Sequence, residues 1–359
     1  MRLLFSALAA VLPTLGLADT LSRDPVVITT TPVLIERMPD GQHLNFDLTV
    51  ANGSEEAIDI DRIELSVFNR DGALVLRRFV DGNGVRPSIG IIGERRIAPG
   101  QRLNVFNPFD TLAAELPVSM LRYDFELSNP DGSRSLRASV QASPRDYRNH
   151  AAYHTPLAGR FINYDGHDAL GHHRRFDVEF APIKAMGFKT NAMRYSYDFV
   201  PVDATGDMYR GEFGDNTAWF GFGAAVRAIG DGTVVAVENA QADNRQFDQS
   251  KLAEDKRVLF GNYVIIDHGG GEFGVYAHAR QGSVTVKPGD RVRRDQTIAA
   301  IGASGSAFFP HLHFQLQDGP TLDAEGLPSY FQRFERVLGK HRVTRKQASI
   351  DTGEIVLAD

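Results

Sequence analysis

The 359-residue sequence contains no cysteine. This absence excludes disulfide bonds, thiolate metal ligands and a cysteine nucleophile, so any metal ion must be held by histidine, aspartate or glutamate. The sequence also lacks an excess of positive charge, because its formal net charge is −6. Without a basic field there is no general electrostatic attraction for nucleic acid, and we expect no nucleic-acid partner.

Apolar runs long enough to cross a bilayer are also absent. The run at residues 3–11 is much shorter than the roughly 20 residues that a membrane-spanning helix needs. Arg2 precedes this run and small residues up to Ala18 follow it, which is the pattern of a cleavable signal peptide. The sequence therefore predicts a signal peptide at residues 1–18 and a periplasmic or secreted protein without stable membrane insertion.

The remaining chain has the composition of a globular protein, with 42% hydrophobic and 23% charged residues. Its length suits about two domains. Residues 44–50 and 58–68 alternate between apolar and polar side chains, as half-buried strands do, and Asn52-Gly53 forms a turn signal between them. We predict a mainly β fold, in which residues 19–143 form an immunoglobulin-like β-sandwich.

Histidine is distributed unevenly along the chain. His43 is the only one of eleven histidines in the first domain, and the others lie at or beyond residue 150. Histidine chemistry is therefore expected in the second half, and the first domain is expected to be accessory or regulatory. We predict a linker at residues 144–157, a second strand-rich domain at 158–340, and a C-terminal tail at 341–359 that is either a last strand or a loose end.

Two histidines separated by one residue give the strongest chemical signal. His311 and His313 lie in a stretch that is predicted to be a strand, where side chains two residues apart project from the same face. Both imidazoles could bind one metal ion, or one could bind it while the other transfers protons. The alternative is a pair of surface histidines on an edge strand.

Two further residues stand in apolar surroundings. His278 lies in the apolar stretch 275–279, where a single histidine is more often structural. Asp198 lies among aromatic and aliphatic residues, and a carboxylate buried there has to be paired, hydrogen-bonded or metal-bound. An internal salt bridge to Arg194 is the simplest alternative for Asp198.

The order of these elements, with the Gly-rich motifs between them, resembles the lysostaphin/LytM family of zinc metallopeptidases over residues 171–331. The intervening motifs are Gly230-Asp231-Gly232, the stretch 261–269, Pro288-Gly289-Asp290 and Gly302-Ala303-Ser304-Gly305. The resemblance implies a domain on an antiparallel sheet with a duplicated hybrid motif. It also implies that Asp198 and His313 bind Zn²⁺, and that His278 and His311 are catalytic.

The sequence departs from the family pattern at the first metal ligand. The family pattern H-x-x-x-D would place a histidine at position 194, where this chain has arginine, which cannot bind a cation. Either the zinc has been lost, or the ligand comes from upstream. A subgroup of exported relatives has a Gly-His-Arg-Arg segment before the aspartate, which resembles residues 171–175 and favours His173 as the ligand, with His172 as the alternative.

The resemblance predicts a zinc-dependent endopeptidase that cuts peptide bonds in the stems or cross-links of peptidoglycan. One alternative is a degenerate LytM domain that binds and activates a cell-wall amidase. Another is a carrier or phosphotransfer module, which the lack of a suitable hairpin lysine and the predicted export disfavour.

Three further expectations concern the surroundings of the site. The polar loop 240–257 is expected to line or cover the substrate groove. Trp219 is expected to pack in the core rather than to form the floor of a groove. Gln315 and Asp318 are expected to be exposed polar residues near a hairpin, rather than groups that hold the metal ligands in place or line the groove.

Overall fold

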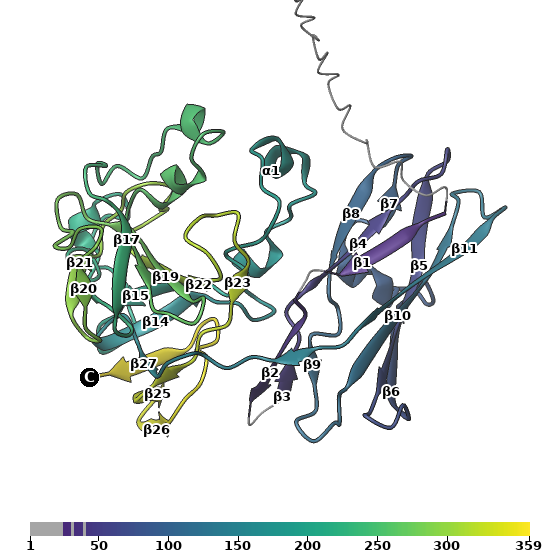
Figure 1. Ribbon diagram of the computed structural model, residues 1–359, viewed down its shortest axis with the longest axis horizontal. Helices are drawn as coiled ribbons and strands as arrows, with labels where there is room; N and C mark the ends of the chain where they lie inside the picture. Colours follow the sequence, from purple (N-terminus) through teal and green to yellow (C-terminus); the bar gives the residue numbers. More distant parts are fainter. Residues whose placement is uncertain (1–23, 30–31, 39–40) are drawn as a thin grey trace, which may run out of the picture.

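The computed structural model describes residues 24–29, 32–38 and 41–359, so the predicted signal peptide lies outside the described residues. The described chain forms two lobes that follow each other in the sequence (Figure 1). Strands dominate both lobes, which confirms the mainly β prediction. Among the described residues, no helix has the length and the apolar character that crossing a membrane would require.

The described residues between 24 and 143, which form the N-terminal half, are built into strands and one 3₁₀ helix, η1 (Ser88–Ile92). The strands are β1 (Val26–Thr29), β2 (Leu34–Met38), β3 (Gly41–His43), β4 (Asp47–Ala51), β5 (Ile58–Phe68), β6 (Leu74–Asp81), β7 (Arg96–Ile97), β8 (Arg102–Phe106), β9 (Thr111–Leu112), β10 (Met120–Ser128) and β11 (Ser135–Ala142). They form the sheets β1-β4-β8 and β11-β10-β5-β6, while β2-β3-β9 form a third sheet with β12 (Arg145–Asp146).

One apolar core joins the first two of these sheets. Alternate residues of β10 are buried, as the period of a strand with one covered face requires. Ile63 and Leu65 of β5 lie in the same cluster as Leu48 and Val50 of β4. The predicted immunoglobulin-like character of this half stays a prediction.

The C-terminal half contains the strands from β13 onward and the remaining short helices. Its strands are β13 (Tyr153–His154), β14 (Gly159–Asp165), β15 (Tyr197–Pro201), β16 (Ala225–Arg227), β17 (Gly232–Glu238), β18 (Asn262–Asp267), β19 (Phe273–Ala279), β20 (Arg291–Val292), β21 (Thr297–Ala300), β22 (Leu312–Gln317), β23 (Gly326–Leu327), β24 (Phe331–Gln332), β25 (Phe334–Leu338), β26 (His341–Arg345) and β27 (Ile355–Ala358). Its helices are η2 (His173–Arg175), α1 (Ala181–Ala185), η3 (Asn216–Ala218), η4 (Gln249–Lys251) and η5 (Lys256–Phe260).

A single large sheet organises this half. In the described part of the chain its order is β20-β17-β18-β19-β22-β15-β14-β27-β25-β26, with β23 beside β22, and its paired strands are antiparallel. β27 lies between β14 and β25, so this part of the predicted tail is a strand of the sheet. The sheet places β19, β22, β15 and β14 side by side at its centre, and the chemical signals of the sequence lie on these strands.

The predicted linker 144–157 is tied to both halves. β12 pairs with β2 of the N-terminal half, and β13 pairs with β24. Tyr147 and Tyr153 both donate hydrogen bonds to the carboxylate of Glu272, and the backbone N–H of His150 donates to the same group. The connection between the halves is therefore held along its length.

Candidate metal and catalytic site

The register of the central strands places the candidate residues in one row. Asp198 of β15 is the cross-strand partner of His313 in β22, and His313 is in turn opposite Ala277 of β19. On the other side, Asp165 at the end of β14 is the partner of Asp198. Residues in register project from the same face of a sheet, so this row gathers groups from four strands.

His313 contacts Asp198 directly. Its Nδ1 lies 3.0 Å from Oδ1 of Asp198, and its Nε2 lies 2.8 Å from Oε1 of Gln315. Because an amide oxygen can only accept, Nε2 of His313 donates to Gln315. With this nitrogen engaged, Nδ1 is the one that can bind a metal ion shared with Asp198.

His173 approaches the same aspartate from the turn η2. Its Nε2 lies 3.8 Å from Oδ2 of Asp198, and its Nδ1 lies 2.5 Å from Oδ2 of Asp165. His173 thus lies between two carboxylates, one at each ring nitrogen. The ring centroids of His173 and His313 are 4.8 Å apart. Both predicted ligands thus lie beside Asp198, one at each of its carboxylate oxygens.

His172 has a different environment. Its Nδ1 lies 3.0 Å from Asp165, but 62% of its side chain is exposed, against 8% for His173. Asp165, His172, His173 and Asp198 each offer a ligand atom within 4.8 Å of the others. The structure therefore brings both of the predicted alternatives to the site, and His173 is the buried one.

The predicted catalytic pair lies beside these groups. His278 and His311 have ring centroids 4.8 Å apart, and Nε2 of His311 is 3.4 Å from Asp198. Nδ1 of His278 donates to the carbonyl of Ser304 at 2.9 Å, and Nδ1 of His311 donates to the carbonyl of Phe309 at 2.8 Å. Each ring thus donates its Nδ1 proton to a backbone carbonyl; Nε2 of His278 then carries the lone pair, whereas Nε2 of His311 faces the carboxylate of Asp198.

A β-bulge explains how His278 reaches the site. Asn262 pairs with Ala279 and the next residue, Tyr263, pairs with Ala277, so His278 is the extra residue in β19. Its φ of 60° lies in the left-handed region, which non-glycine residues rarely adopt. Bulges re-aim a side chain, and such strained backbone often occurs at functional sites.

Burial and the neighbouring charges set the protonation of the cluster. Burial alone would raise the pKa of Asp198, but His173 and His311 outweigh it and hold this pKa well below its usual range. Burial lowers the pKa of His278 well below its usual value, and it also lowers the pKa of His173. For His311 burial is outweighed by Asp198, which raises the pKa. The site thus combines an ionised carboxylate with His278 and His173, whose neutral forms burial favours, and with His311, whose protonated form Asp198 stabilises.

This donor set fits a zinc ion. Neutral imidazole nitrogens and a carboxylate oxygen are typical zinc ligands, and a catalytic site uses three protein ligands and keeps one position open. The acceptors Asp165 and Gln315, which face the remote nitrogens of His173 and His313, correspond to the groups that usually orient metal-binding histidines.

Arg194 is not the partner of Asp198. Its Nη1 lies 2.8 Å from Asp47 of the N-terminal half, and its Nε lies 3.7 Å from Glu325. The alternative of an internal Arg194–Asp198 salt bridge is therefore wrong, because Arg194 turns away toward two other carboxylates. Asp198 is surrounded by histidines instead.

Two residues of the site were missed or misjudged from the sequence. Asp165 gave no signal, because its role depends on the register between β14 and β15. Gln315 is fully buried, so the expectation of an exposed polar residue is wrong for it, while Asp318 is exposed as expected. Gln315 is two residues after His313, and the same-face spacing that joined His311 to His313 could have pointed to it.

The surroundings of the site are aromatic on one side. Trp219 is buried and stacks on Phe309, with ring centroids 4.8 Å apart, which confirms that it packs in the core. In the loop 240–257, the carboxylate of Asp243 accepts hydrogen bonds from the backbone N–H groups of Gln281 and Ala303. The loop is thus fixed near β19, and its predicted role at the substrate groove stays a prediction.

Part of the chain is similar in sequence to known proteins. Residues 219–324 match the model of Peptidase family M23. The peptidoglycan DD-endopeptidase ShyB of Vibrio cholerae is 34% identical over 94 residues, which cover 26% of this chain and 18% of that protein. The murein hydrolase activator EnvC of Escherichia coli is 30% identical over 95 residues, which cover 26% of this chain and 18% of that protein.

Among solved structures, the catalytic domain of lysostaphin from Staphylococcus simulans is 24% identical and covers 34% of this chain and 86% of that chain, with a TM-score of 0.22. The present chain matches 18% of the length of each of the two curated relatives, ShyB and EnvC.

Proposed function

Since the C-terminal half contains a domain of peptidase family M23, we propose that the protein is a zinc-dependent endopeptidase that hydrolyses peptide bonds in peptidoglycan stems or cross-links. ShyB, one of the similar proteins, is named for such an activity. The substrate class is carried over from this likeness and is tested below.

The main support is the convergence of two buried histidines on one buried aspartate. We assign His173, Asp198 and His313 as the zinc ligands and His278 and His311 as the catalytic residues. His172 is the less suitable ligand, because its ring is largely exposed and only its Nδ1 is turned toward Asp165. Arg194, at the place of the usual first ligand, is engaged with Asp47 instead.

Zinc at this site supplies a Lewis acid that polarises the scissile carbonyl and lowers the pKa of a water toward about 7. His278 stands next to the ligands with its lone pair on Nε2, so it can take a proton from the water, while His311, whose protonated form Asp198 stabilises, can give one to the leaving amine. Their hydrogen bonds to Ser304 and Phe309 keep both rings in this orientation during proton transfer.

The test is a metal analysis of the purified protein together with digestion of isolated peptidoglycan. We expect about one zinc ion per chain and release of soluble muropeptides with newly formed amino groups, which a chelator abolishes and added zinc restores. Release that continues unchanged in the metal-free protein would contradict the proposal.

The second candidate is a non-catalytic domain that activates a cell-wall amidase, which the likeness to EnvC favours. Such a protein would release no muropeptides alone, but would increase the release by a purified amidase. The set of four buried histidines and one buried aspartate favours the enzyme. In either role the polymer lies outside the cytoplasmic membrane, so we propose a periplasmic or secreted protein, and cell fractionation tests this location.

A further inference from the structure

The residues between β14 and β15 lie where the two halves of the molecule meet. This connecting segment, residues 166–196, carries His173, and its only regular elements are η2 and α1. His173 therefore lies outside the strands, and Asp165 at the end of β14 is the strand residue that contacts its ring and accepts from its backbone N–H, at 3.3 Å. The side-chain amide of Asn191 donates to the carbonyl of His173 at 2.9 Å, which ties one part of the segment to another. The position of His173 depends on Asp165 and on what holds the rest of the segment.

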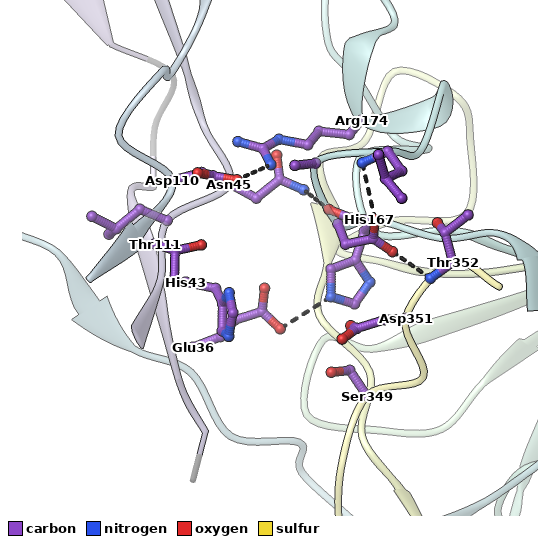
Figure 2. Close-up of a pocket in the computed structure, with 14 residues that line it drawn as sticks. Glu36, His43, Asn45, Asp110, Thr111, His167, Arg174, Ser349, Asp351 and Thr352 are labelled. Atoms are coloured by element: carbon purple, nitrogen blue, oxygen red, sulfur yellow. Dashed lines mark hydrogen bonds and ion pairs between the residues drawn. The ribbon is translucent and has the colours of Figure 1, made fainter. Parts of the chain in front are cut away.

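Arg174, directly after His173, is held by the N-terminal half. Its Nη1 lies 2.9 Å from Oδ2 of Asp110, and its Nη2 donates to the carbonyl of Asn107 at 3.4 Å. The Arg174 side chain is 7% exposed and that of Asp110 is 28% exposed. Figure 2 shows Arg174 and Asp110 facing each other across the junction. A buried guanidinium needs such a partner, because an unpaired charge is costly to desolvate.

The other end of the segment is held in the same way. Arg194 pairs with Asp47 at 2.8 Å, and both side chains are 5% exposed. The side-chain amide of Asn45 donates to the backbone carbonyls of Arg194 and His167, at 2.9 and 3.1 Å. The hydroxyl of Tyr195 donates to the carbonyl of Asn45 at 2.9 Å. Both ends of the connecting segment are thus bound to β4 and its neighbourhood in the N-terminal half.

A cavity separates the remaining surfaces at this junction. It has a volume of about 290 Å³, and Asp110 and Arg174 line it together with His167 and Asn45 (Figure 2). The polar contacts at the wall of this cavity include Arg174 with Asp110 and His167 with Glu36, whose Nε2–Oε2 distance is 3.3 Å.

We propose that the N-terminal half completes the metal site by holding the connecting segment, with Asp110 and Asp47 as positioning residues for His173. This inference rests on the proposed function, because it takes His173 as a zinc ligand. It gives the first domain a defined task in the peptidase and explains why arginine occupies position 194. There the side chain anchors the segment to Asp47 instead of binding metal.

The experiment measures zinc affinity by competition with a chromogenic chelator. Asp110→Asn keeps the size of the side chain but removes the charge that faces Arg174. We expect the affinity for zinc to fall about 10- to 100-fold, as for other groups that orient a metal ligand. Asp59→Asn is the matched control, because Asp59 pairs with Arg96 on a strand of the same half at 2.8 Å, far from the segment. This control should change the affinity less than about twofold, as expected when an exposed pair is broken.

Two further variants separate positioning from general stability. Asp110→Glu keeps the charge and should restore most of the affinity. Asp47→Asn should weaken zinc binding as well, and circular dichroism shows whether each variant is folded. If the buried Asp47 variant does not fold, the Asp110 variants decide the question alone.

In the cobalt-substituted protein, the visible absorption bands should change in Asp110→Asn and stay unchanged in Asp59→Asn.

The outcomes distinguish this inference from the proposed function. Equal zinc affinity and identical cobalt spectra in the wild type and a folded Asp110→Asn variant would overturn the positioning role and leave the peptidase proposal intact. Weaker binding in the variant of a protein that releases no muropeptides would support the positioning role and overturn the proposed catalysis. A wild type that binds no zinc would overturn both.

Discussion

β22 and the connecting segment both bring a histidine to Asp198, but the two are held differently. β22 is hydrogen-bonded to β15 on one side and to β19 on the other, and its six residues are all buried. The connecting segment has no strand on either side; Asp165 at the end of β14 holds His173 itself, and Asp47, Asp110 and Asn45 of the other half hold the rest of the segment. One ligand is fixed by the sheet, and the other is fixed by one strand residue together with contacts between the halves.

This difference teaches which parts of the site are sensitive to distant changes. In β22 the backbone hydrogen bonds of two neighbouring strands position His313, and single side chains contribute little to that. For His173 the position results from a few buried ion pairs, whose loss costs about 3–5 kcal/mol when one partner is removed. Substitutions far from Asp198 should therefore affect the His173 side of the site more than the His313 side.

The largest effect is expected from removing either ligand. His173→Ala and His313→Ala should each abolish stoichiometric zinc binding and lower muropeptide release by about a thousandfold or more, because several kcal/mol of transition-state stabilisation are lost. His172→Ala is the matched control for the segment and should retain activity within about tenfold, since only one imidazole need complete the site. If His172→Ala lost the zinc and His173→Ala kept it, the assignment of the two would be reversed.

Removal of a catalytic histidine should lower the turnover number without lowering the affinity for zinc. His278→Ala should lower the turnover number by about 10²- to 10⁴-fold, the usual range for a proton-transfer group, while zinc affinity changes little. The hydrogen bond of His278 goes to the carbonyl of Ser304, and not to Asp198 or to the connecting segment, so its loss should leave the zinc ligands in place. Steady-state kinetics and metal titration of the same preparation check this prediction. A loss of zinc in this variant would show that His278 is a ligand.

The acceptors behind the two ligands allow a direct comparison between the two sides. Asp165→Asn and Gln315→Met each alter the group that faces the remote nitrogen of a ligand histidine. We expect zinc affinity to fall about tenfold or more in both, with the larger loss for Asp165→Asn, because the strands still hold His313 in place. Chelator competition measures both values. A larger loss for Gln315→Met would contradict the idea that the sheet alone fixes His313.

The smallest effect concerns Glu325, which lies 3.7 Å from Arg194 at the end of the connecting segment. Burial raises the pKa of Glu325 from 4.5 to about 7, against the lowering effect of Arg194. The folded state then binds more protons than the unfolded state between these two values, so this group's contribution to stability is present below pH 4.5 and is lost as the pH rises through about 7.

Glu325→Gln removes this dependence. Relative to the wild type, the variant should gain unfolding free energy as the pH rises from 5 to 7, by on the order of 1–3 kcal/mol at about 1.4 kcal/mol per pKa unit. Urea unfolding at the two pH values, followed by circular dichroism, measures the difference. Glu126→Gln, at an exposed pair with Arg137, is the control and should show no change. A constant difference for Glu325→Gln across this range would refute the prediction.

The parts of the site that lie on strands could be predicted from the sequence. The spacing of His311 and His313 gave the shared face, and the apolar stretch around Asp198 indicated a buried carboxylate with polar partners. Both predictions depend only on the period of a strand and on the cost of burying charge. The mainly β fold followed in the same way from alternation and turn residues.

The remaining parts depend on contacts that no local pattern contains. Arg194 and Asp47 are 147 positions apart in the sequence, and Asp165 acquires its place only through its register with Asp198. The bulge at His278 could not be predicted either, because an extra residue in a strand leaves the amino-acid composition of that strand typical of a strand. The sequence therefore indicated which residue types mattered, while the pairing of distant segments decided how they are oriented.

Trp219 gives this protein an internal optical probe. It is the only tryptophan of the chain, and its ring stacks on Phe309, whose carbonyl oxygen holds the imidazole of His311. Indole emission responds to movement and to charge nearby, so entry of a metal ion or a peptide beside His311 should alter its intensity or wavelength. Occupancy could then be followed in real time with unlabelled material.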